Sequence, residues 1–319
     1  MKLYLVLILF LISLIGCTKN DNVKVDIEDI NVKTEIYRFD QDFYTSSTNE
    51  LPELKNTYPF LFPAQVNDSV WVNKMNDKDE SELFDETQKV YKNFDVYEAQ
   101  LNNLFKHIKY YYPKFHEPKI ITLLTNIDSE NKVILTDSLL LISLDVFLGK
   151  NHEFYGDFPN YIKQNFTKDQ LIVAVAEEFT QKFIIPSNDK SFVSKMVQEG
   201  KKVELMHHFL PNIESAELLG YLEEQKQWVD DNESEIWKYF IQNSLLFSND
   251  PELSVRFINK APFSKFYTAN DKDSPGEIGV WLGWQIVQSY MKNNKVTIQK
   301  MLVTPNETIF KKSKYKPKK

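Results

Sequence analysis

The 319-residue chain has few residues of the types on which several common protein classes depend. It contains only two arginines, Arg38 and Arg256, and its 45 acidic residues outnumber 38 basic ones, which argues against nucleic-acid binding through basic patches. Eight glycines are too few to favour glycine-rich phosphate loops. The single cysteine, Cys17, excludes an internal disulfide. With 42% hydrophobic residues, the chain can still bury a sizeable core.

Motifs for the common catalytic chemistries are missing as well. The sequence has no G-x-S-x-G elbow, no phosphate loop and no dinucleotide fingerprint. Its histidines form no H-x-x-x-H pair, so no helix offers two imidazoles on one face to zinc. We therefore expect no catalytic residue, no metal ligand and no cofactor. The five histidines are His107, His116, His152, His207 and His208.

The N-terminus predicts a lipoprotein signal peptide. Lys2 precedes an apolar run from Leu3 to Ile15, which has the length of a signal-peptide core and falls short of the roughly 20 residues that span a bilayer. The run ends in Leu14–Cys17 (LIGC), which resembles a bacterial lipobox. The resemblance implies cleavage before Cys17 and lipidation of its thiol. An uncleaved signal anchor is the alternative.

Three segments are predicted along the chain. Residues 1–16 are the signal peptide, residues 17–33 a lipidated tether, and residues 34–319 a single globular domain. Thr18–Lys33 is polar and charged, as is typical of a tether, although a first strand packed on the domain is an alternative. No later apolar stretch is long enough to cross a bilayer. The domain is therefore expected to be held at a membrane surface.

Hydrophobic periodicity predicts a mostly helical α+β fold. Helical spacing recurs over Asp68–Tyr112, and the chain after Pro159 is expected to be helical. Short β-rich runs predict a small mixed sheet. The predicted strands are Thr34–Asp40, Lys119–Thr125, Lys132–Thr136 and Ser138–Leu144. The predicted later helices are Thr167–Ile184 with Thr167 as N-cap, Lys190–Phe209, Ser215–Trp228, Glu233–Leu246, Pro251–Ile258 and Pro275–Met291, followed by a frayed tail over Lys311–Lys319.

The apolar segment Leu171–Phe183 (LIVAVAEEFTQKF) resembles the gluzincin metallopeptidase helix that carries H-E-x-x-H. The two histidine slots fall on Ala176 and Thr180, and the general-base slot holds Glu177. Glu199 stands where gluzincins place a third, glutamate ligand on a following helix. A small sheet before this helix is also the zincin order. The resemblance therefore implies a zincin-like fold.

The same comparison implies that the metal chemistry is lost. Catalytic zinc needs three protein ligands and an open water position. Ala176 offers no ligand, a neutral Thr180 hydroxyl is a poor one, and Glu199 alone would not hold the metal. Glu177 would then have no zinc-bound water to deprotonate, so hydrolysis fails. We expect a pseudo-peptidase, with an ordinary amphipathic helix as the alternative to a degenerate zincin.

Several short motifs follow the lipobox in a recognisable order. They are Tyr37–Phe43 (YRFDQDF), Tyr58–Phe62 (YPFLF), Leu144–Tyr155 (LDVFLGKNHEFY) and Gly279–Trp284 (GVWLGW). Together they resemble the gliding motility lipoprotein GldB family of Bacteroidota, over roughly the first 312 residues. The resemblance implies an envelope lipoprotein required for gliding over surfaces, in bacteria whose gliding is tied to type IX secretion. It carries over no catalytic residue.

These observations predict a membrane-anchored, non-catalytic lipoprotein of the gliding apparatus. Its expected location is the cell envelope, at the outer membrane. Its expected partners are the lipid membrane, through acylated Cys17, and other gliding or type IX secretion proteins. Two alternatives stay open: a zinc enzyme with unconventional ligands, in which His152 or His207 joins Glu199, and a lipoprotein that holds a peptide in the former active-site cleft.

Overall fold

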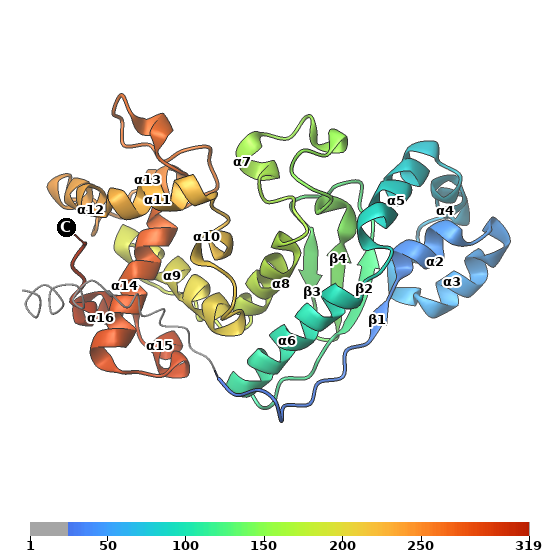
Figure 1. The fold of residues 1–319 in the computed structure, drawn as a ribbon, viewed down its shortest axis with the longest axis horizontal. Helices are drawn as coiled ribbons and strands as arrows, with labels where there is room; N and C mark the ends of the chain where they lie inside the picture. Colours follow the sequence, from blue (N-terminus) through green and yellow to red (C-terminus); the bar gives the residue numbers. More distant parts are fainter. Residues whose placement is uncertain (1–24, 319) are drawn as a thin grey trace, which may run out of the picture.

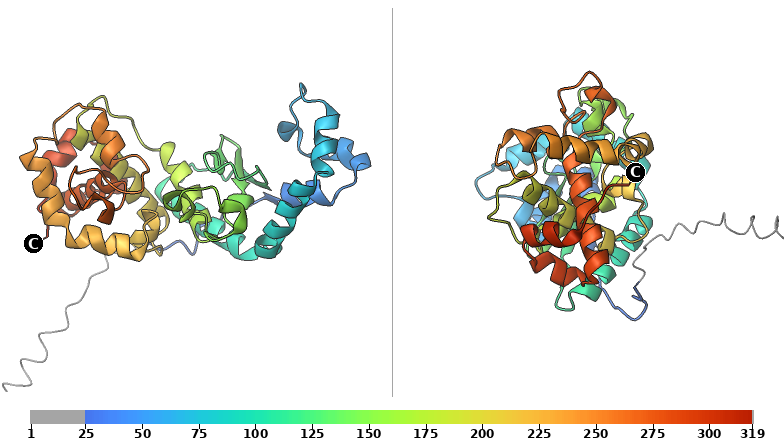
Figure 2. Two further views of the ribbon diagram at one scale, coloured as in Figure 1. Left: turned by 90° about the horizontal axis from the view of Figure 1, so that it is seen from above. Right: turned by 90° about the vertical axis from the view of Figure 1, so that its left-hand side faces the viewer.

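A computed structural model describes residues 25–318 of the chain. The predicted signal peptide and Cys17 lie outside the described residues. The described elements form an elongated molecule, with helices at both ends and a small sheet between them (Figures 1 and 2). The α+β class and the small mixed sheet are confirmed. Within residues 25–318, no helix combines the length and the apolarity that a bilayer crossing requires.

The N-terminal helices gather around an aromatic core of their own. Strand β1 (Ile36–Tyr37) is shorter than the predicted Thr34–Asp40, because helix α2 already begins at Phe39. The buried Asp40 carboxylate pairs with Arg38 at 2.7 Å. The helices are α2 (Phe39–Thr45), α3 (Leu51–Thr57) and α4 (Asp68–Met75), and the core residues are Phe43, Leu51, Leu54, Tyr58 and Phe62. Helix α5 (Lys78–Tyr91) follows, and its Leu83 and Tyr91 belong to the main hydrophobic core.

The sheet has four strands in the order β1-β2-β4-β3. Strand β2 (Lys119–Leu123) pairs in parallel with β1 and with β4 (Leu139–Ser143). Strand β3 (Val133–Leu135) pairs antiparallel with β4 at the edge. All three lie inside their predicted ranges. Helix α6 (Asp95–Tyr111) ends shortly before Pro113, as predicted, and runs alongside the sheet (Figure 1).

The remaining helices share the main hydrophobic core with the sheet; the first two lie beside the sheet, and the later ones form the other end of the molecule (Figure 1). They are α7 (Asn160–Lys163), α8 (Gln170–Gln181), α9 (Phe192–Phe209), α10 (Ser215–Leu218), α11 (Glu223–Asp231), α12 (Glu233–Gln242), α13 (Glu252–Phe257), α14 (Ile278–Asn294), α15 (Ile298–Val303) and α16 (Asn306–Ser313). Short 3-10 turns occupy Thr48–Glu50, Pro59–Leu61, Leu144–Val146, Glu153–Tyr155 and Asp271–Asp273.

Three local predictions for this region are wrong. The predicted helix Ser215–Trp228 is two helices, because the chain turns at Gly220 with a φ of +66°. Thr167 is not the N-cap of α8, which begins at Gln170 after a turn. The predicted frayed tail is ordered in its described part, where α16 runs to Ser313 and the Tyr315 hydroxyl donates to Glu233 at 2.6 Å.

Candidate functional site

A cavity of about 110 Å³ lies where α8, α9 and the start of α14 meet. Short segments around β3, α10 and α13 complete its wall, so distant parts of the sequence contribute to one space. Apolar side chains of α8 and α9 line part of it. Six charged residues complete the lining: Lys132, Glu177, Glu199, Lys202, Lys260 and Glu277. The cavity thus brings three carboxylates and three ammonium groups together.

Helix α8 presents one face to this cavity. Gln170, Val173, Ala174 and Glu177 recur at the three- and four-residue spacing that places helical side chains above one another. The first turns of this face are apolar or amide-bearing, and only Glu177 contributes a charge. Helix α8 therefore supplies a largely apolar wall with a single carboxylate at its far end.

Close backbone contact between α9 and α14 positions two further carboxylates. Gly200 of α9 lies against Gly283 of α14, where a Cβ on Gly200 would be 2.3 Å from the Gly283 carbonyl carbon. Such an approach is open only to residues without a side chain. Glu199 precedes one of these glycines, and Glu277 stands at the start of α14. The close contact between α9 and α14 therefore brings the carboxylates of Glu199 and Glu277 to the same cavity.

Glu277 has an unusual backbone conformation. It has a φ of +57° at the N-cap of α14, and its carbonyl accepts a hydrogen bond from the Val280 amide at 2.8 Å. Burial raises the pKa of the Glu277 carboxyl to about 7, because the apolar surroundings disfavour its ionised form. Lys260 and Lys132 oppose this rise, while Glu177 and Glu199 add to it.

Lys132, just before β3, faces the same cavity. Burial lowers the pKa of its ammonium group to about 8, and the charge of Lys260 acts in the same direction. Glu177, Glu178 and Glu277 oppose this lowering of the pKa without cancelling it. The Lys132 Nζ atom also lies 6.0 Å from the centre of the Phe147 ring. Lys132 and Glu277 are therefore both close to a change of charge near neutral pH.

Most of these charges lack a direct partner. Glu199 and Lys202 form an ion pair at 2.8 Å on α9. Across residues 25–318, the side chains of Lys132, Glu177, Lys260 and Glu277 make no hydrogen bond and no ion pair within 4.0 Å. Two carboxylates and two ammonium groups thus line one cavity without forming ion pairs with each other.

The predicted zincin positions separate into two groups. Glu177 and Glu199 both line the cavity, so the structure brings these two predicted positions together. Ala176 and Thr180 are fully buried and do not line it. The Thr180 hydroxyl instead donates to the Glu177 carbonyl oxygen at 2.7 Å. Within the described chain, the two histidine slots therefore do not face the same space as the two glutamates.

Four charged cavity residues were missed by sequence reasoning, and one of them, Lys202, lies three residues after Glu199 on α9. The other three, Lys132, Lys260 and Glu277, come from a strand edge, a loop and a helix start, with no shared spacing in the sequence. Of these three, only Glu277 had a usable signal, because it lies inside the glycine-containing segment Pro275–Met291. Glycines in such a segment indicate that a helix end approaches neighbouring backbone closely, and a carboxylate beside them is therefore a candidate site residue.

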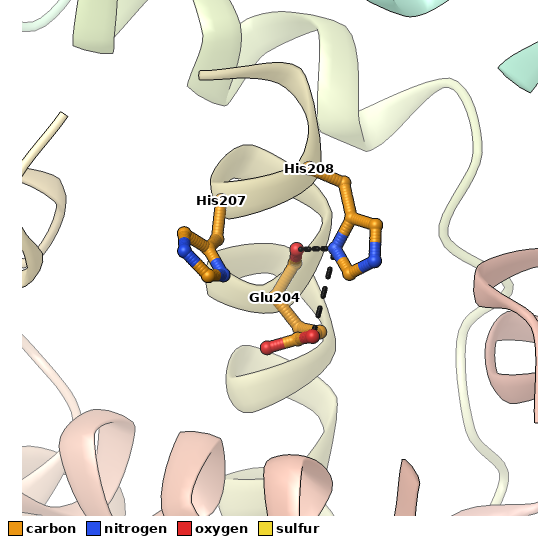
Figure 3. A group of neighbouring side chains, drawn as sticks. All are labelled: Glu204, His207 and His208. Atoms are coloured by element: carbon orange, nitrogen blue, oxygen red, sulfur yellow. Dashed lines mark hydrogen bonds and ion pairs between the residues drawn. The ribbon is translucent and has the colours of Figure 1, made fainter. Parts of the chain in front are cut away.

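A second group of titratable side chains lies on α9. Among the described residues, only one group of three potential metal-ligand side chains has ligand atoms within 4.8 Å of one another. It consists of Glu204, His207 and His208 (Figure 3). His208 Nδ1 lies 2.8 Å from the Glu204 carbonyl oxygen, so this nitrogen donates a proton and is not free to bind a metal. Trp284 Nε1 donates to the Glu204 carboxylate at 2.7 Å.

Burial lowers the pKa of both imidazoles and raises that of the Glu204 carboxyl. The buried Nδ1 atom of His207 has no hydrogen-bond partner among residues 25–318. This arrangement links α9 to α14 through Trp284. The Nε2 atom of His208 points away from Glu204 and His207 (Figure 3), so at most two ligand atoms face each other, one fewer than catalytic zinc requires. The residue set proposed for an unconventional zinc site is also not gathered. The His152 Nε2 atom lies 3.3 Å from the Glu86 Oε2 atom. Neither His152 nor His207 lines the cavity that contains Glu199.

Comparison with known families identifies the chain. A family model described as gliding motility protein GldB matches residues 20–317, nearly the whole chain. The protein therefore belongs to the GldB gliding motility family. No curated protein and no solved structure gives a significant match.

Proposed function

We propose that this GldB family member is a lipid-anchored, non-catalytic component of the gliding apparatus that acts through contacts with other envelope proteins. The observation that carries the proposal is the family match over residues 20–317. The lipobox-like Leu14–Cys17 supports the lipid anchor, because thiol acylation with more than one chain gives stable membrane attachment. An outer-membrane location belongs to the same proposal.

The non-catalytic part rests on the absence of zinc-binding side chains at the expected positions. Ala176 has no ligand atom, and the Thr180 hydroxyl is committed to a backbone carbonyl. In the part of the chain that the structure describes, no histidine lines the cavity that contains Glu177 and Glu199. A zincin mechanism at this place would have neither its metal nor its activated water.

Deletion of the gene in the source bacterium tests the motility role. We expect the deletion strain to stop spreading on agar and the wild-type gene in trans to restore spreading. Purified protein supplied with Zn²⁺ and a mixture of unmodified peptides tests the non-catalytic part, with an active zincin peptidase as positive control. Intact peptides after prolonged incubation are expected. Peptide cleavage abolished by a zinc chelator would overturn the non-catalytic proposal.

A second candidate function is peptide binding in the former active-site cleft. The observation that favours it is the cavity itself, which is lined by Glu177 and Glu199 together with unpaired charges of both signs. A pseudo-peptidase that has lost its metal can retain the surface on which a peptide lies. Titration of the purified protein with peptides tests this candidate, and saturable binding is the expected result.

A further inference from the structure

The cavity separates charges that would normally pair. Glu177 comes from α8 and Glu277 from the start of α14, while Lys132 precedes β3 and Lys260 follows α13. No nitrogen–oxygen distance between these four side chains is within the 4.0 Å of an ion pair in the described chain. Glu277 and Lys132 are half-buried, whereas Glu177 and Lys260 are exposed to solvent. The two half-buried opposite charges attract each other strongly in their weakly polarisable surroundings, so their separation leaves space for a ligand between them.

A ligand with one sign of charge would satisfy only half of these groups. An anion would contact the two ammonium groups and leave two carboxylates facing a space from which water had been displaced. The half-buried Glu277 carboxylate would then lose water without gaining a partner, which is costly, so such a complex would be unfavourable. A ligand that carries both an ammonium group and a carboxylate would give each side chain an opposite charge.

The backbone at Glu277 also points to a ligand site. A φ of +57° is disfavoured for a residue with a side chain, and strained residues of this kind concentrate at binding and catalytic sites. Gly276 packs so closely that a Cβ there would lie 2.2 Å from the Ala261 carbonyl oxygen. The surrounding backbone thus fixes the strained turn that places the Glu277 carboxyl at the cavity.

We propose that this cavity binds a zwitterionic ligand of the amino-acid or short-peptide class. Glu177 and Glu277 hold the ligand's ammonium group, and Lys132 and Lys260 hold its carboxylate. The inference rests on the second candidate function and names the chemistry of its ligand. It does not depend on the motility role, because its test uses only purified protein.

The purified full-length chain in detergent is titrated with alanine, Ala-Ala, Ala-Ala-Ala, Leu-Leu and Lys-Glu. Calorimetry measures the binding. Two capped probes, N-acetyl-Ala-Ala and Ala-Ala amide, each lack one of the two charges. We expect saturable binding of at least one free probe and at least tenfold weaker binding after capping of either end. The relative affinities of alanine and the peptides then distinguish a free amino acid from a peptide as the ligand.

Two variants connect the binding to this cavity. Lys132→Met and Glu277→Gln remove one charge of each sign while keeping a side chain of similar length, and each should weaken binding at least tenfold. The matched control combines Lys311→Met with Glu307→Gln, an exposed ion pair on α16, and should bind like the wild type. Circular dichroism establishes that each variant is folded. Absence of saturable binding by every free probe, equal binding of capped probes, or unchanged binding by folded cavity variants would overturn the proposal.

Discussion

Gly200 on α9 and Gly283 on α14 are in direct backbone contact. A Cβ on Gly283 would lie 1.8 Å from the Met196 carbonyl oxygen, and one on Gly200 would lie 2.3 Å from the Gly283 carbonyl carbon. The contact brings the two helices together beside the cavity, so that Glu199 and Glu277 reach the same space. The geometry of the site therefore depends on two residues that have no side chain.

Substitution of either glycine should destabilise the protein. Gly283→Ala places a methyl group against backbone atoms that cannot rotate away, so we expect a loss of about 3 kcal/mol or more, the upper end for overpacking. Denaturant unfolding followed by circular dichroism measures this loss. Gly156→Ala is the matched control, because its Cβ would meet only the Glu153 carbonyl oxygen at an ordinary 3.4 Å. Equal stabilities of the two variants would contradict the described helix contact.

Ligand binding to the cavity should depend on pH with a maximum between about 7 and 8. Below the pKa of Glu277, about 7, its carboxyl takes up a proton and no longer attracts the ligand's ammonium group. Above the pKa of Lys132, about 8, its amine becomes neutral and no longer attracts the carboxylate. The groups facing these two residues are Glu177, Glu199, Glu178, Lys260 and Tyr221.

Calorimetric titrations with a free dipeptide from pH 5.5 to 9 measure the profile. Glu277→Gln should weaken binding at the maximum and flatten the acidic limb. Lys132→Met should make the basic limb less steep and leave only the fall caused by the dipeptide's own α-amino group, whose pKa is about 8. An affinity that stays constant from pH 6 to 9 in the wild type would contradict the assigned roles of the two residues.

Lys132 should react with acylating reagents faster than the other lysines. With a pKa near 8, about half of its amine is neutral at pH 8, whereas an ordinary lysine with a pKa near 10.4 is almost fully protonated. Brief labelling with an amine-reactive reagent, followed by peptide mass spectrometry, identifies the first residue modified. A bound zwitterionic ligand should protect it. Lys201 is an internal control, because it shares a lowered pKa near 8 but is buried and donates to the carbonyls of Leu302 and Thr304.

The sequence allowed much of the fold to be predicted, and the reasons for the errors are local. The strands within 119–144 were found because their β-rich runs are short and bounded by turn residues. Helix Ser215–Trp228 was predicted as continuous because one glycine is compatible with a helical pattern, whereas Gly220 adopts a left-handed turn beside Asn165. Strand Thr34–Asp40 was overextended because Asp40 is buried at a helix start, which alternation does not reveal.

The site was only partly predictable. Glu177 and Glu199 could be singled out because each belongs to a helix whose spacing resembles a known family. Lys132 and Lys260 could not, because an isolated lysine next to a strand or a turn is usually a solvated surface residue. Their position in one cavity with Glu277 depends on tertiary contacts between segments that are far apart in the sequence. Such contacts leave no periodic signal in a single sequence.

The buried group on α9 should not hold a stoichiometric metal ion. The His208 Nδ1 atom donates to the Glu204 carbonyl oxygen and its Nε2 atom points away from the group (Figure 3), which leaves Glu204 and His207 as the ligands that face each other. Elemental analysis of the purified chain should find less than about one tenth of an equivalent of zinc, and a chelator should leave the melting temperature unchanged. One zinc per chain, lost together with His207→Ala, would instead assign a metal centre to this group.

The proposed lipid anchor and the proposed motility role both depend on Cys17, which lies outside the described residues. The most direct test complements a gene-deletion strain with the wild-type chain or with Cys17→Ala, with protein abundance matched by immunoblotting, and measures colony spreading on agar. We expect the wild-type chain to restore spreading and co-sediment with outer membranes, and Cys17→Ala to do neither. Full spreading by Cys17→Ala at equal abundance, or undiminished spreading by the deletion strain itself, would contradict a lipid-anchored gliding protein.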